Sequence, residues 1–129
     1  MNNYMGGIGS MALFTNQFVL NISLPSISVP ASAFVFLDES AATLSDAYFV
    51  VSLTTNYAQI SPIDLPASYH LNSGNFSFAD GHAQTKHWQT RLLAEGINTK
   101  KFILDSRNNP DYIWLMKNTT MPITGIWPE

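Results

Sequence analysis

The dipeptide Asp80-Gly81 constrains the fold of this chain more than any other feature of its sequence. Asp-Gly between alternating residues is a strong hairpin signal, because a two-residue type I′ turn needs positive φ at both central positions. In such a turn Ala79 pairs with His82. One face of the hairpin is then mostly apolar, with Phe76, Phe78, Ala83 and Thr85. The other face is polar, with Asn75, Ser77, Gln84 and Lys86. We therefore expect a ribbon that buries one side and leaves the other in water.

Further strands and a short helix are predicted on both sides of the hairpin. Residues 33–38 and 46–53 are rich in β-branched and aromatic residues, which is typical of buried strands. Residues 89–95 predict a short helix that ends at Gly96, and residues 100–105 predict a short strand.

A second helix is predicted directly after Asn109. The Asn109 side chain can cap it, Pro110 suits the first helical position, and Asp111 favours the positive end of the helix dipole. Three apolar residues then share one face of this helix, namely Tyr112, Leu115 and Met116.

The remaining segments are less regular. We expect a short helix within residues 11–23, a proline-punctuated connector over residues 24–31 and a long surface loop over residues 54–69. Together these elements predict one domain over residues 1–129. Its fold class is α+β, with an antiparallel sheet of about four to five strands, short helices and long loops.

The composition excludes several function classes. Only 12% of the 129 residues are charged and the net charge is −3, so the chain lacks the basic footprint of a nucleic-acid-binding protein. It has no cysteine, which excludes disulfides and thiolate chemistry. No run of about 18 apolar residues and no secretory signal pattern is present in the sequence.

A possible chemical site combines His70 with Asp80. These two residues, joined by His82 and by Asp38 or Glu39, could form a metal site or a His–Asp acid–base pair. A straight strand over residues 75–79 would keep His70 away from Asp80 unless the chain doubles back before it. The structural alternative, which we prefer, makes Asp80 a turn former and His70 a buried, hydrogen-bonded residue.

Other catalytic arrangements find little support. His82 and His87 lie five residues apart on one strand and so face opposite sides of it. The sequence also has no Gly-x-Ser-x-Gly elbow. We therefore expect that the chain is not an enzyme.

The spacing His70–x9–Asp80-Gly81 carries a resemblance to a known family. Three other segments agree with it in the same order: Met1-Asn-Asn-Tyr-Met-Gly, Pro30-Ala-Ser-Ala-Phe-Val-Phe-Leu-Asp-Glu39 and Asn109-Pro-Asp-Tyr-Ile-Trp-Leu115. On these residues the chain resembles the prepilin-type H-X9-DG family, whose members are pseudopilin-like. The resemblance implies that His70, Asp80 and Gly81 are this chain's counterparts of the family's motif residues.

The resemblance implies a structural and interaction role. The chain would be the C-terminal globular portion of a pseudopilin-like protein, at the periplasmic or extracellular face of the cell envelope. It would associate with other pilin-like subunits or components of a type II secretion or type IV pilus-like system. Relatives have an N-terminal helix as membrane anchor, which this chain would lack, so we expect it to be monomeric or weakly associating.

Two other functions stay open. The chain could be a binding module whose 54–74 loop and polar hairpin face hold calcium, a glycan or an exported protein. Related major pseudopilins have a calcium site in a C-terminal loop, and loop carboxylates are available here at Asp64, Asp105 and Asp111. A metal-dependent enzyme using His70, Asp80 and Glu39 is the third hypothesis.

Overall fold

The structure is a computed structural model of the chain. It describes residues 1–5, 17–21, 23–53, 59–60, 62–90, 104–105 and 109–127. The helices predicted within residues 11–23 and over residues 89–95 lie mostly outside the described residues, as does most of the strand predicted over residues 100–105.

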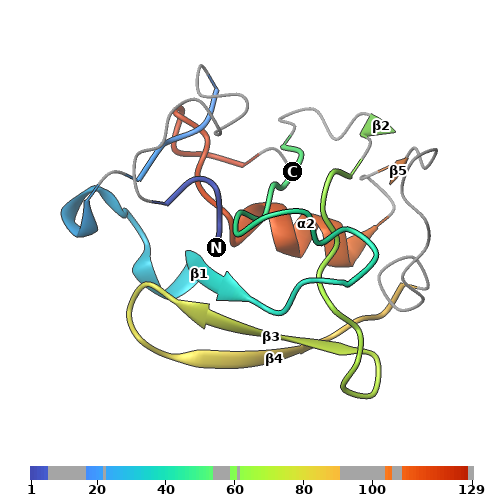
Figure 1. Cartoon of the computed structure of the whole chain (residues 1–129). Coiled ribbons are helices and arrows are strands. Elements are labelled where there is room, and N and C mark those ends of the chain that lie inside the picture. Colours follow the sequence, from blue (N-terminus) through green and yellow to red (C-terminus); the bar gives the residue numbers. More distant parts are fainter. Residues whose placement is uncertain are drawn as a thin grey trace.

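The principal sheet has three antiparallel strands (Figure 1). They are β1 (Phe34–Leu37), β3 (Ser73–Phe78) and β4 (Ala83–His87), in the order β1-β3-β4. A separate two-stranded ladder joins β2 (Gln59–Ile60) to β5 (Leu104–Asp105). The α+β class is thus confirmed, but the prediction of one sheet of about four to five strands is wrong for the described residues.

The segment over residues 46–53 accounts for part of that difference. It enters the core, where Phe49, Val51 and Leu53 are buried, but it forms only a single bridge, between Phe49 and Asn2. The backbone N–H of Val50 donates instead to Asp64 Oδ2 at 2.6 Å. The apolar pattern therefore predicted burial correctly and strand pairing wrongly.

The hairpin is confirmed, but its register differs from the predicted one by a residue. Ser77 pairs with Ala83, and Phe76 with Gln84. The Phe78 carbonyl accepts from Gly81 N at 3.0 Å, and Phe78 N donates to the His82 carbonyl at 2.9 Å. The loop thus has three residues, 79–81, a common hairpin connection in which a residue with positive φ ends the turn. Gly81 takes that place, with φ +94°.

A register shift of one residue turns a strand over. On β4, Ala83 and Thr85 are therefore exposed rather than buried, which corrects the predicted apolar face. The side of β4 opposite Phe78, Phe76 and Gly74 instead carries His82, Gln84 and Lys86. Of these three, only Lys86 is partly buried.

The helix α2 (Pro110–Lys117) begins as predicted. The Asn109 side chain accepts from Tyr112 N at 2.9 Å, and Pro110 occupies the first turn. Two 3₁₀ helices, η1 (Leu24–Ser26) and η2 (Pro30–Ser32), each have a proline near their start and divide the predicted connector. No helix among the described residues is long and apolar enough to cross a bilayer.

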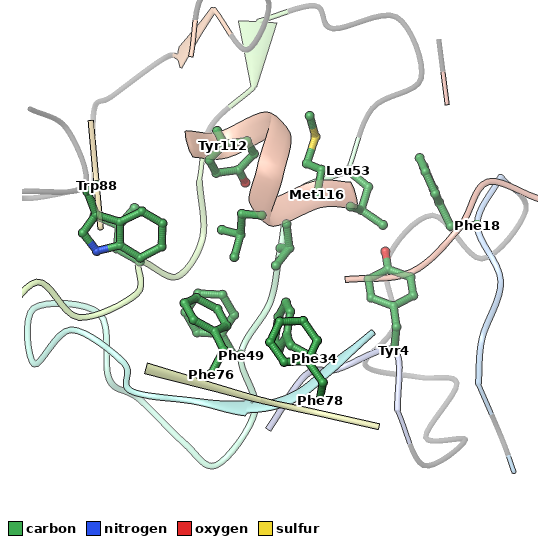
Figure 2. Close-up of a cluster of buried hydrophobic side chains, with 13 residues drawn as sticks. Tyr4, Phe18, Phe34, Phe49, Leu53, Phe76, Phe78, Trp88, Tyr112 and Met116 are labelled. Atoms are coloured by element: carbon green, nitrogen blue, oxygen red, sulfur yellow. The ribbon is translucent and has the colours of Figure 1, made fainter. Parts of the chain in front are cut away.

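The core lies between α2 and the inner face of the sheet (Figures 1 and 2). Phe34, Phe76 and Phe78 face the predicted helix residues Tyr112, Leu115 and Met116, and all six are buried. Phe76 packs edge-on against Trp114 and Trp88, with ring centroids 5.0 and 5.9 Å away.

Gly74 allows Trp88 to reach this core. A Cβ added there would lie 2.9 Å from the Ala67 carbonyl oxygen and 3.1 Å from Trp88 Cζ2. The Trp88 indole donates to that same carbonyl at 2.9 Å. Only glycine therefore lets the sheet and this loop approach each other so closely.

Candidate functional site

The two motif residues His70 and Asp80 stand at opposite ends of β3. Strand β3 spans Ser73–Phe78, which at roughly 3.4 Å per residue places about 17 Å between its ends. His70 lies in the turn before the strand, and Asp80 lies in the hairpin loop after it. The structure therefore does not bring the two side chains together.

Asp80 interacts with its neighbour in the loop. Its Oδ1 accepts from His82 N at 3.1 Å and lies 2.6 Å from His82 Nδ1. These contacts, the backbone hydrogen bond first, lower the pKa of Asp80. The His82 ring in turn stacks on Phe78, with centroids 4.3 Å apart and planes 5° apart. Asp80, Gly81 and His82 together hold the hairpin turn.

His70 is exposed and faces Asp38. His70 Nε2 lies 3.9 Å from Asp38 Oδ2, and both side chains are well exposed to solvent. The prediction that His70 is buried is wrong, because the turn before β3 projects from the molecule. Its neighbour Leu71 is 92% exposed.

A row of polar side chains continues from Asp38 across the outer face of the sheet. Asn75 Nδ2 donates to Asp38 Oδ2 at 2.8 Å, and Thr85 Oγ1 donates to Asn75 Oδ1 at 2.8 Å. We call Asp38, Asn75 and Thr85 the polar row. It joins the end of β1 to β3 and β4, and His70 lies at its Asp38 end.

Glu39 belongs to a different environment from its neighbour Asp38. Its Oε1 accepts from Thr43 Oγ1 at 3.3 Å. Partial burial, followed by the nearby charge of Asp64, raises the pKa of Glu39 to about 7. Burial also raises the pKa of Asp64, which is 5% exposed.

The predicted metal ligands do not converge. Among the described residues, no three His, Asp or Glu side chains are placed so that they could share a metal ion. Of the calcium candidates, Asp64 is bound by Val50 N, and Asp111 lies in an ion pair. Asp105 is in β5, paired with Gln59.

The ion pair of Asp111 with Lys86 was missed by sequence reasoning. Asp111 is fully buried, and its Oδ2 accepts from Gln89 N, Thr90 N and Thr90 Oγ1 at 2.7–2.9 Å. Its Oδ1 makes no hydrogen bond in the described part of the chain, but Lys86 Nζ lies 3.4 Å away. Lys86 Nζ also lies 5.5 Å from the centre of the Trp114 ring. The correct hairpin register turns Lys86 inward, but its pairing with Asp111 also depends on how α2 packs against the sheet.

A broad apolar groove runs beside the β1 edge of the sheet. Its volume is about 500 Å³. Large apolar side chains that line it are Met1, Met5, Leu24, Ile27, Val35, Phe36 and Phe78. Leu24 is 74% exposed and Phe36 is 57% exposed. We call this surface the apolar groove.

Comparison of the chain with protein-family models, with curated proteins and with solved structures finds no match. Two surface features remain on the described part of the chain, the apolar groove and the polar row.

Proposed function

We propose that this chain is a non-enzymatic interaction domain of a pseudopilin-like protein, associated with a type II secretion or type IV pilus-like system. The observation that carries the proposal is the apolar groove with its exposed Leu24 and Phe36. Exposed apolar side chains gathered around a hollow are typical of protein–protein interaction sites. The His-x9-Asp-Gly spacing supports the family, and the places of its residues support a structural role for them.

In this proposal the partner is another pilin-like subunit or a component of the same machine. The domain would work at the periplasmic or extracellular face of the cell envelope. His70 and Asp80 would stabilise opposite ends of the hairpin, the first beside Asp38 and the second through His82. Neither residue would need to contact a substrate.

The test is co-isolation from the bacterium that encodes the protein, with a tag on the full-length gene product. Leu24→Glu combined with Phe36→Glu should reduce recovery of a pilin-like subunit at least tenfold, because two charges enter the contact surface. Leu71→Glu, at an even more exposed leucine at the other end of β3, should recover as much as the unaltered protein. Equal recovery from both variants, or partners with no pilin-like member, would reject the proposal.

A second candidate function is an extracytoplasmic binding module for calcium, a glycan or an exported protein. The polar row and the exposed Phe36 on the outer face favour it, since oxygen-rich side chains beside an aromatic ring suit such ligands. A calcium-dependent rise in melting temperature that disappears in Asp38→Asn would support this function over the first. An unchanged melting temperature with calcium would remove the calcium form of it.

A further inference from the structure

A second, smaller pocket lies beside the apolar groove, at the C-terminal end of α2. Its volume is about 200 Å³, below the roughly 300–1,000 Å³ of sites for drug-sized ligands. Val19, Ile27, Met121 and Trp127 form much of its apolar lining. A ligand that fits here must be small, with an apolar body.

Two polar side chains distinguish this pocket from an ordinary surface hollow. Asn21 lines it and is only 6% exposed, yet its side-chain amide makes no hydrogen bond with any residue that the structure describes. The amide of Asn21 therefore keeps two donors and one acceptor that a ligand in the pocket can use. Asn21 therefore indicates a ligand with a hydrogen-bonding group.

Lys117 indicates that the ligand's hydrogen-bonding group carries a negative charge. It is the one charged residue among those lining the pocket, it is exposed, and it forms no ion pair within the described part of the chain. A carboxylate can accept from a lysine and an amide at the same time. We propose that this pocket binds a small amphipathic carboxylate, with its apolar chain against Ile27 and Trp127 and its head group at Asn21 and Lys117.

The experiment compares octanoate with 1-octanol, which has the same chain without the charge. Titration of the purified chain, followed by ligand-observed NMR, should give a dissociation constant for octanoate about tenfold below that for octanol. Lys117→Gln should remove this preference, and Lys117→Arg should keep it. Because Lys117 is exposed, neither variant should disturb folding.

Two further variants locate the site. Asn21→Ala should weaken octanoate binding more than octanol binding, and Ser28→Trp, which fills the pocket from its rim, should weaken both. Thermal unfolding of each variant checks that the fold is retained. The proposal is overturned if wild-type protein binds octanoate no more tightly than octanol, if Lys117→Gln keeps the preference, or if a folded Ser28→Trp variant binds octanoate as wild type does.

Discussion

At the residue scale, the pair Lys86–Asp111 makes a large and testable contribution to stability. Asp111 is fully buried and Lys86 is 16% exposed, so removal of one partner leaves the other charge inside the protein. Breaking a buried pair in this way costs about 3–5 kcal/mol. We expect Asp111→Ala to lower the free energy of unfolding by that amount, as measured by urea denaturation.

The control for Asp111 is the matching change of its partner. Lys86→Met keeps the stem that packs on Trp114 and leaves Asp111 with its three hydrogen-bond donors. The double variant should lose less stability than the sum of the two single changes, because no unpaired charge then remains. A loss below about 1 kcal/mol for Asp111→Ala, or simple additivity, would contradict a buried pair.

Glu39 gives the protein a stability that depends on pH. The pKa of its carboxyl is raised from 4.5 to about 7, because burial and the charge of Asp64 disfavour the ionised form. A raised carboxyl pKa means that this group destabilises the fold once it ionises. Its favourable state is fully present below pH 4.5 and is lost as the pH rises through about 7.

Glu39→Gln removes this ionisation. Relative to wild type, the variant should gain stability as the pH rises from 4.5 to 8, with most of the gain below about 7. Melting temperatures of both proteins across that range make the comparison. A difference that stays constant with pH would show that Glu39 keeps an ordinary pKa in the fold.

At the element scale, the hairpin shows how one residue of register decides which side chains are buried. The three-residue loop leaves Ala83 exposed, whereas a two-residue loop would turn it toward the core. Ala83→Lys should therefore change the free energy of unfolding by no more than about 0.5 kcal/mol in urea denaturation. Phe78→Ala, on the buried side, should cost about 3–5 kcal/mol. A cost above about 2 kcal/mol for Ala83→Lys would instead favour the two-residue loop.

Local signals explain which elements could be predicted from the sequence. The cap Asn109, Pro110 and the spacing of Tyr112, Leu115 and Met116 define α2 within a single stretch of chain. The strand at Phe34–Leu37 and the existence of the hairpin follow from equally local patterns. The pairing of residues 46–53 does not, since it depends on Asp64 and on the N-terminal segment, both distant in sequence.

The candidate site was less predictable than the fold. The spacing of His70 and Asp80 is visible in the sequence, but whether they meet depends on β3 being straight between them. His70 and Asp80 contact partners that lie at very different distances along the sequence. His82 is two residues from Asp80, whereas Asp38 reaches His70 only through the sheet. Neither the Lys86–Asp111 pair nor the apolar groove has a signal within one stretch of chain.

At the scale of the whole molecule, one side of the sheet packs against the core and the other side faces solvent. Helix α2 lies on one side of the sheet (Figure 1), with the aromatic core packed between them. The hydrogen-bonded polar row occupies the other side. The apolar groove lies at the β1 edge and is the surface that we assign to a partner. We expect the isolated chain to sediment as a monomer at micromolar concentration, and a stable oligomer would contradict a partner supplied by other subunits.

The most direct test of this account is cysteine crosslinking in the native cell, since the chain itself contains no cysteine. Phe36→Cys places a single thiol in the apolar groove, and Leu71→Cys places one on the distant turn before β3. With a short bismaleimide, the first should give a crosslinked product that mass spectrometry identifies as a pilin-like subunit, and the second should not. Equal crosslinking at both positions, or a product at Phe36→Cys that contains no pilin-like protein, would contradict the account.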